Sequence, residues 1–274
     1  MNVSYKISRV FVYTFMAVFS LICFFPFYSM IIMGTYYAND LYTGIKLLPA
    51  NYLFENFKTL LSIDIWSFYR NSLVVSITAT ALGTLVCAAA GYAFAKFQFR
   101  LKKTIYTFIL LTLMVPTQLG VVAYVMEMKA LWLTNTLLPL ILPYIATPFG
   151  VFWMTQYAGD AIPSEVLDSA KIDGAGEFRA FTSIVLPFLK SAMFTLGLLI
   201  FLWTWNNFFL PVVIVSDASL YTIPLGIRQL ATTFRVDYGA QILGVSVGTI
   251  PILIFFAVFS KNLIAGLSAA AVKG

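Results

Sequence analysis

Six long apolar runs constrain this chain more than any other feature of its sequence. They contain no Asp, Glu, Lys or Arg and span residues 10–33, 71–95, 104–125, 137–157, 191–211 and 240–260. A helix needs about 20 apolar residues to cross the hydrocarbon core of a bilayer, so each run is long enough. Helices are expected because a backbone in lipid must satisfy its own hydrogen bonds, and the short alternating segments of a β-barrel are not seen. The sequence predicts an all-α polytopic membrane protein with six transmembrane helices.

The composition agrees with this class. Hydrophobic residues make up 61% of the chain and charged residues 10%, far from the balance of a soluble domain. No segment between the runs has room for a soluble domain, so a single membrane domain over residues 1–274 is expected. Cys23 and Cys87 lie inside runs, which argues against a disulfide framework. Histidine, the commonest zinc ligand and general base, does not occur, and we expect no metal site and no catalytic cluster.

Basic residues are divided unequally between the two sides of the membrane. With six spans both termini lie on one side, and that side carries most of the 17 Lys and Arg residues and the whole net charge of +6. The positive-inside rule therefore predicts that both termini and the segment 158–190 are cytoplasmic. The net charge reflects orientation in the membrane and gives no reason to expect nucleic-acid binding. The first run follows Lys6 and Arg9 as a signal peptide would, but it is long and lacks a small-residue cleavage site, so we interpret it as a retained span.

The polar segment 162–187 has the pattern of two helices joined by a glycine turn. Pro163 suits the first turn of a helix, where its missing N–H costs nothing. Gly174 and Gly176 provide the backbone freedom that a helix end needs, and a second helix is expected from about Glu177 until Pro187 disrupts it.

Each helix of this segment has an apolar side. The apolar residues expected on the first are Ile162, Val166, Leu167 and Ala170, and on the second Phe178, Phe181 and Val185. Two interpretations fit this pattern equally well. The segment is either an amphipathic hairpin at the lipid surface or a lever whose first helix inserts into a groove on a soluble partner.

The same segment resembles a known signature. Residues 165–175, Glu-Val-Leu-Asp-Ser-Ala-Lys-Ile-Asp-Gly-Ala, followed by Ile-Val-Leu-Pro at 184–187, are similar to the "EAA" signature of binding-protein-dependent ABC importer permeases. Asp173, Gly174 and Pro187 match that signature directly. Residues 168–170, Asp-Ser-Ala, stand where Glu-Ala-Ala is usual, and Ser191 stands where proline is common.

Other stretches narrow the resemblance. Residues 71–76 with 91–100, and 205–211 with 220–226, resemble blocks of carbohydrate permeases. The tail 265–274, Ala-Gly-Leu-Ser-Ala-Ala-Ala-Val-Lys-Gly, resembles the "GLTAGAVKG" ending of MalG-like subunits. The chain thus resembles the MalG-like carbohydrate ABC importer permeases, which implies the type I (MetI-like) permease fold in the inner membrane of a bacterium.

The resemblance implies several partners. They are a second, MalF-like permease, two ABC ATPases that bind ATP and Mg, an extracytoplasmic sugar-binding protein and a carbohydrate substrate. This chain has no G-x-x-x-x-G-K phosphate loop, so it is expected to bind no cofactor and to be no enzyme itself.

The resemblance also assigns candidate site residues. Coupling to the ATPase is expected from Glu165, Leu167, Asp168, Ser169, Ala170, Asp173, Gly174, Lys273 and Gly274. Contact with the binding protein is expected from the outer loop that contains Asp217, Tyr221, Pro224 and Arg228. Candidates for the translocation pathway, because amides and aromatic faces suit sugars, are Gln118, Trp203, Trp205, Asn206 and Asn207. Tryptophan is also common at membrane interfaces, and that alternative stays open.

Small residues recur every four positions in the second run, at Ala79, Gly83, Cys87 and Gly91. Such a ridge lets helices approach closely in lipid, either within this chain or against a partner subunit.

Other functions remain as alternatives. The chain could be a permease for a non-sugar solute, a self-contained secondary transporter, a membrane scaffold or sensor, or half of a homodimer. A secondary transporter typically needs ionisable residues within its spans, and the six runs contain none.

Overall fold

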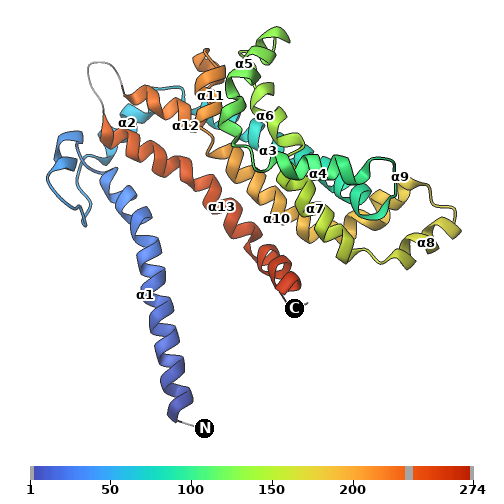
Figure 1. The fold of residues 1–274 in the computed structure, drawn as a ribbon. Helices are drawn as coiled ribbons and strands as arrows, with labels where there is room; N and C mark the ends of the chain where they lie inside the picture. The colour runs from blue at the N-terminus through green and yellow to red at the C-terminus, as the bar shows by residue number, and fades with distance from the viewer. Residues whose placement is uncertain (1–2, 232–236, 272–274) are drawn as a thin grey trace. The chain divides into compact units, whose positions relative to one another are not determined.

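The computed structural model describes residues 3–231 and 237–271, and every regular element within them is a helix (Figure 1). The chain forms two compact units. The first comprises Met1–Ile65 and Gly226–Ile250, and the second comprises Trp66–Leu225 and Pro251–Gly274.

The first unit begins with α1 (Val3–Met33) and contains the short helices η1 (Ala38–Tyr42), α2 (Leu53–Leu61) and η5 (Ile227–Leu230), followed by the start of α13 (Tyr238–Ala271). Its central polar residue is Asn56, which is fully buried. The Asn56 amide Nδ2 donates to the carbonyl oxygens of Gly34 and Tyr36 at 2.9 and 2.8 Å. These bonds hold α2 against the chain that leaves α1, and they satisfy carbonyls at a helix end.

The second unit is a bundle built from α3 to α12 together with the part of α13 that begins at Pro251. Its helices are α3 (Ile65–Lys96), α4 (Lys102–Thr112), η2 (Thr117–Gly120), α5 (Val121–Ala130), α6 (Leu138–Ile145), α7 (Pro148–Ala161), α8 (Ser164–Ile172), α9 (Glu177–Ala180), the π-helical turn η3 (Phe181–Val185), α10 (Leu186–Trp205), α11 (Phe209–Ile214), η4 (Ala218–Leu220) and α12 (Ile223–Gly226). Helix α7 packs along α10, α8 and α9 project from one end of the bundle, and α5 and α11 lie toward the other (Figure 1).

The small-residue ridge of α3 packs inside this unit. A Cβ atom on Gly83 would lie 2.4 Å from the carbonyl oxygen of Tyr144 in α6, and one on Gly91 would lie 2.5 Å from Cβ of Met154 in α7. Ala79 and Cys87, on the same ridge, are fully buried. Of the two interpretations of this ridge, the structure therefore favours packing within the chain.

Five helices are long and apolar enough to span a membrane. They are Arg9–Met33, Ile65–Lys96, Leu138–Ala161, Glu177–Trp205 and Tyr238–Ala257, and they correspond to five of the six expected runs. The expected run 104–125 is instead a pair of helices, Lys102–Thr112 and Thr117–Ala130, bent by 95°. Pro116 explains the bend, because it lacks an N–H and disfavours helical backbone in the residue before it. The number of spans is five, or six if the bent pair counts as one.

The fifth span differs from the expectation at both ends. Pro187 does not end a helix, because α9, η3 and α10 run on from Glu177 to Trp205. The π turn over Phe181–Val185 ends two positions before Pro187. It accommodates the loss of the backbone hydrogen bond that the proline cannot donate. At its other end the helix stops at Trp205 rather than at Pro211, which lies in α11.

Candidate functional site

The turn between α8 and α9 is held by specific backbone geometry. Gly174 has φ +75°, which L side chains rarely adopt. The N–H of Gly174 donates to the carbonyl of Lys171 at 3.0 Å, and the N–H of Ala175 donates to that of Ala170 at 2.9 Å. This pair of bonds is a Schellman motif, in which a left-handed glycine closes a helix end. The glycine stop predicted from the sequence is the turn of this hairpin.

The carboxylates of α8 face outward. Glu165, Asp168 and Asp173 are exposed, as are Ser169 and Gly174. Helix α8 and its C-cap therefore carry three exposed carboxylates against one exposed lysine, Lys171, and among the described residues of the hairpin no ion pair joins them. A cationic or hydrogen-bond-donating partner surface would be complementary to these carboxylates.

Two of the predicted coupling residues, Leu167 and Ala170, are buried, unlike the exposed carboxylates. Leu167 is 8% exposed and Ala170 is 6% exposed, and Leu167 belongs to the core of the second unit together with Ile162. These two side chains fix α8 to its own bundle, and Ala170 also supplies the carbonyl of the Schellman motif, while their role in coupling stays a prediction. The expected apolar stripe on the first helix is thus the face that packs inward.

Two large apolar side chains are exposed beside the turn. Ile172 at the end of α8 is 86% exposed, and Phe178 at the start of α9 is 81% exposed. The expectation that Phe178 shares a face with Phe181 and Val185 is wrong, because Phe181 stacks on Tyr92 and Val185 is fully buried.

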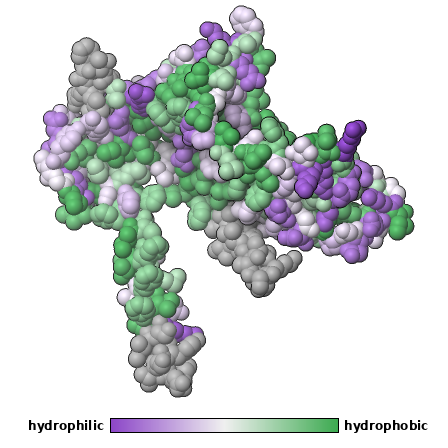
Figure 2. Space-filling model, in the orientation of Figure 1, coloured by the Kyte–Doolittle hydropathy of each residue, from purple (hydrophilic) through white to green (hydrophobic). Residues whose placement is uncertain are grey.

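Sequence reasoning did not single out Ile172. Its signal was present, since an isoleucine one position before Asp173 falls outside the stripe formed by Ile162, Val166 and Ala170. The hairpin thus combines exposed carboxylates with two exposed apolar side chains. Hydrophilic residues gather over the end of the second unit that carries α8 and α9 (Figure 2).

The candidate pathway residues divide into accessible and structural ones. Gln118 in η2, Trp203 and Asn206 are exposed, and the Trp203 ring lies edge-on to Phe149 with centroids 5.7 Å apart. Trp205 is only 2% exposed and stacks on Phe201 with centroids 5.5 Å apart. Trp205 is therefore a buried side chain in this structure, and its place in the pathway stays a prediction.

The two asparagines after Trp205 hydrogen-bond to groups of the protein itself. Asn206 Nδ2 donates to the carbonyl of Leu202 in its own helix at 2.9 Å. Asn207 Nδ2 donates to the hydroxyl of Tyr144 at 2.7 Å, and its Oδ1 accepts from the N–H of Leu210 at 3.1 Å. Asn207 thus links α6 to the start of α11, which accounts for a polar side chain at this position without a ligand.

The outer loop of the second unit is anchored by side chains that the sequence did not point out as anchors. Asn71 Nδ2 donates to the carbonyls of Ser219 and Tyr221 at 2.8 and 3.0 Å. Asn135 Oδ1 accepts from the N–H of Ser216 at 2.8 Å. These bonds give residues 216–221 a defined shape, with Asp217 exposed and Tyr221 half-buried. Asn135 has φ +57°, and because asparagine adopts this conformation more readily than most residues, the asparagine itself was the available signal of a turn.

One further predicted loop residue cannot be added to this loop, and two predicted coupling residues cannot be placed. Arg228 is exposed but belongs to the first unit, whereas Asp217, Tyr221 and Pro224 belong to the second. Lys273 and Gly274 lie outside the described residues. Among the residues that the structure describes, no group of three His, Cys, Asp or Glu side chains could hold a metal ion.

Asp217 closes the η4 turn, and its titration should be visible there. Its Oδ1 accepts from the N–H of Ser219 at 2.9 Å and from the Ser219 hydroxyl at 2.8 Å. The N–H donor and then the hydroxyl lower the pKa of Asp217 from its ordinary 3.8. Because the folded pKa is depressed, the cap is complete above pH 3.8 and is lost only as pH falls through the lower folded value.

Amide hydrogen exchange checks this. The Ser219 amide should stay protected through pH 3.8 in the native chain and be unprotected at all pH values in Asp217→Ala. Protection in Asp217→Ala equal to that of the native chain would contradict the cap.

The chain matches one family model over residues 83–268, that of the binding-protein-dependent transport system inner membrane component. It belongs to this family. It is therefore a multi-pass protein of the cytoplasmic membrane and a transport subunit rather than an enzyme.

Curated relatives of this inner-membrane component are sugar permeases. It is 31% identical to the lactose transport system permease protein LacG of Rhizobium radiobacter, over 93% of each chain. It is also 31% identical to the arabinooligosaccharides transport system permease protein AraQ of Halalkalibacterium halodurans, over 94% of each chain.

Solved structures share its fold. A bacterial ABC transporter involved in the import of the polysaccharide alginate matches with a TM-score of 0.79 and 18% identity, over 95% of this chain and 98% of that one. An alginate ABC transporter in complex with a pentasaccharide-bound periplasmic protein matches with a TM-score of 0.60 and 14% identity, over 96% and 99%. The MetI-like permease fold expected from the resemblance is confirmed.

Proposed function

We propose that this inner-membrane component is one membrane half of an ATP-driven sugar importer that receives its substrate from an extracytoplasmic binding protein. The relatives named for lactose and arabinooligosaccharides match nearly their whole length, which supports an oligosaccharide or another carbohydrate as substrate. The alginate transporter that shares the fold is recorded with a substrate-loaded periplasmic protein, and this supports the same arrangement here.

The observation that carries the coupling role is the exposed hairpin of α8 and α9. Its carboxylates and the side chains of Ile172 and Phe178 are exposed, while Leu167 and Ala170 tie it to the bundle. An apolar anchor ringed by polar groups is the composition of an interaction surface. The hairpin couples this subunit to a separate ATPase, which binds ATP and Mg, and a second, MalF-like permease completes the pathway.

The transport cycle we propose is alternating access driven from outside this chain. ATP closes the ATPase pair, the coupling hairpins of the two permeases move together, and the bundles open toward the docked binding protein. ATP and substrate must each bind the two states differently, because a ligand with equal affinity for both shifts nothing. Moving such an equilibrium from 1:99 to 99:1 takes about 5.5 kcal/mol, well within what several ligands provide together.

The membrane orientation follows from the basic residues. The hairpin and both termini face the cytoplasm, and the loop around Asp217 and Tyr221 faces the binding protein. In this orientation the family's C-terminal tail reaches toward the ATPase.

Affinity purification of this subunit from solubilised native membranes tests the proposal. The expected result is co-purification of a second polytopic permease and an ATPase with a phosphate loop, together with sugar uptake that stops when ATP is depleted. Recovery of the chain alone, with uptake unaffected by ATP depletion, would indicate a self-contained transporter instead.

Reversing the charge of Asp168 should weaken association with the ATPase without preventing membrane insertion. Asp168 is exposed on α8, so Asp168→Lys is not expected to disturb the bundle, but it places a cation on the acidic side of the hairpin. Losing one favourable charge contact and gaining a repulsive one should weaken ATPase association by about tenfold or more. The measurement is the amount of ATPase retained per permease in purified membranes.

A matched control is Asp160→Lys, which makes the same change at an exposed residue of α7 outside the hairpin. ATPase retention in Asp160→Lys should stay near that of the native chain. Unchanged retention in Asp168→Lys would favour the other interpretation, a hairpin at the lipid surface.

A further inference from the structure

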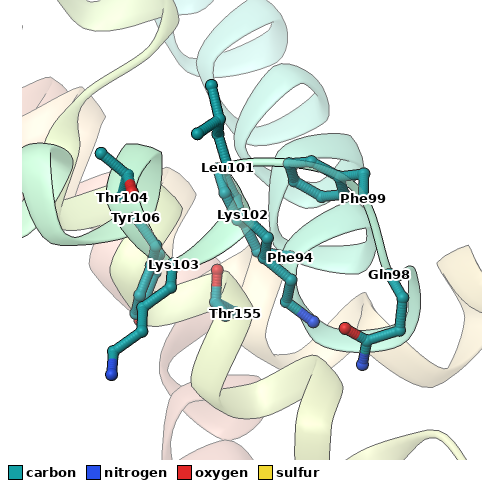
Figure 3. Close-up of a pocket in the computed structure, with 9 residues that line it drawn as sticks. All are labelled: Phe94, Gln98, Phe99, Leu101, Lys102, Lys103, Thr104, Tyr106 and Thr155. Carbon is teal, nitrogen blue, oxygen red and sulfur yellow. The ribbon is translucent and has the colours of Figure 1, made fainter.

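A pocket of about 730 Å³, lined by both apolar and polar side chains, opens where the end of α3, the following loop and the start of α4 meet α7 (Figure 3). It lies within the second unit, and none of its residues takes part in the hairpin or the outer loop. The lining residues used below are Gln98, Phe99, Leu101, Lys102, Lys103 and Thr104.

Positive charge is concentrated at this pocket. The loop and first turn carry Arg100, Lys102 and Lys103 within four positions, and Lys96 ends α3 just before them. Helices α3 and α4 contain no Asp or Glu, and α7 contains Asp160 alone. The pocket therefore has a clear excess of cations.

Two of these four cationic side chains donate hydrogen bonds to backbone carbonyls, and two do not. Lys102 Nζ donates to the carbonyl of Phe97 at 2.8 Å, and Lys96 Nζ donates to that of Gly159 at 3.0 Å, so these two are held by the protein. Lys103 and Arg100 are exposed, and among the described residues neither has an ion pair. In Figure 3 Lys102 and Gln98 extend toward the same side of the pocket, Lys103 extends on the other side of Thr155, and Leu101 points away from all three.

The start of α4 adds no competing anion. Its N-cap is Leu101, which has φ +67° and no side-chain acceptor to offer the first-turn N–H groups. Most helices carry Ser, Thr, Asp or Asn there. The partial positive charge of this helix end thus adds to that of the lysines.

An apolar surface continues directly from the pocket along α4. Leu101 is 61% exposed, Ile105 43% and Phe108 67%. Helix α4 is one arm of the bent pair that is apolar enough to enter a membrane. Cations and an apolar face are thus joined at the end of a membrane helix, which is where the headgroup and the acyl chain of a lipid meet.

We propose that this pocket binds the headgroup of an anionic phospholipid. The ammonium of Lys103, which lines the pocket, and the guanidinium of Arg100, which lies in the adjoining loop and does not line it, hold the phosphate. The amide of Gln98 and the hydroxyl of Thr104 bond its polar substituents, and an acyl chain lies over Ile105 and Phe108. Charge-assisted hydrogen bonds to phosphate are the strong contacts of this set. A soluble phosphate compound would leave the apolar face unused, so we favour the lipid. The site is independent of the transported solute and of the ATPase.

Native mass spectrometry of the delipidated full-length chain tests this. Phosphatidylglycerol and phosphatidylcholine with identical acyl chains are titrated onto the native chain and onto Arg100→Gln/Lys103→Gln. The native chain should bind one phosphatidylglycerol in preference to phosphatidylcholine. The double variant should weaken phosphatidylglycerol binding by about tenfold or more, since each basic residue near an anionic headgroup contributes about fivefold.

The matched control is Arg179→Gln/Lys190→Gln, which removes the same charge from exposed positions on α9 and α10. It should bind phosphatidylglycerol like the native chain. Equal loss in both double variants would mean a diffuse charge effect and overturn the site, as would equal affinity of the native chain for both lipids.

Competition with glycerol 3-phosphate tests whether the pocket binds a lipid headgroup or a soluble phosphate compound. Glycerol 3-phosphate should displace phosphatidylglycerol poorly, because it lacks acyl chains. Phe108→Gln should weaken the binding of phosphatidylglycerol but not that of glycerol 3-phosphate. If glycerol 3-phosphate displaces the lipid at equal concentration, the pocket is a site for soluble phosphates and the lipid proposal fails.

Discussion

Gly174→Val is expected to abolish sugar uptake while leaving the chain in the membrane. The glycine has φ +75°, a conformation that a β-branched residue adopts only at a cost of about 1–3 kcal/mol. The Schellman bonds from Gly174 and Ala175 then break, and the exposed hairpin of α8 and α9 loses its shape. Because the hairpin is the proposed coupling element, uptake and substrate-stimulated ATP hydrolysis should both fall by about tenfold or more.

Gly176→Val provides the matched control in the same loop. Gly176 has φ −66°, which any residue adopts, and a Cβ there would meet nothing within 4 Å. Uptake in reconstituted vesicles should therefore stay near normal in this variant. Normal uptake with normal ATPase stimulation in Gly174→Val would defeat the coupling assignment, whereas equal loss in both variants would mean that the loop tolerates no added side chain.

The sequence predicted which segments are helical more reliably than their shape. Apolar runs report length and hydrophobicity, and both are properties of local composition, so five of the six runs coincide with single helices long enough to span a membrane. The 95° bend after Thr112 was missed, although Pro116 marks its place. A proline in an apolar run is compatible with a kinked helix or with a broken one, and the neighbouring helices decide between them.

Side-chain roles near the membrane were harder to predict than the backbone. The sequence predicts a place in the translocation pathway for Trp205, Asn206 and Asn207, because aromatic and amide side chains suit sugar binding. Their partners are Phe201, a carbonyl of the same helix and the hydroxyl of Tyr144. A polar side chain in a membrane helix must satisfy its own hydrogen bonds first, and sequence alone does not show which partner does so.

The hairpin of α8 and α9 contains features that the sequence predicts and features that it does not. Its glycine stop was predictable, because a left-handed turn has a strong residue preference. Ile172 falls outside the apolar stripe beside Leu167, so the sequence separates these two residues, but only the packing shows that the stripe faces the bundle and that Ile172 is exposed. The exposure of Phe178 follows from the structure alone, since the sequence predicted that it shares a face with Phe181 and Val185.

Gly91→Ala should destabilise the second unit through a single added methyl group. A Cβ at Gly91 would lie 2.5 Å from Cβ and 2.6 Å from the carbonyl carbon of Met154, and 2.8 Å from the backbone nitrogen of Thr155. Backbone atoms cannot rotate away, so α3 and α7 must separate. Overpacking of this kind costs about 1–3 kcal/mol, which corresponds to a fall in Tm of about 5 °C or more.

Gly159→Ala makes the same change at an exposed residue of α7, where an added Cβ meets nothing within 4 Å. Alanine favours a helix over glycine by about 1 kcal/mol, so this variant should keep or raise the Tm. Thermal unfolding of the two detergent-solubilised variants, followed by size-exclusion chromatography, therefore gives shifts of opposite sign. Equal Tm values would show that α3 and α7 are less closely packed than the contact at Met154 requires, and that the ridge from Ala79 to Gly91 is available to another subunit.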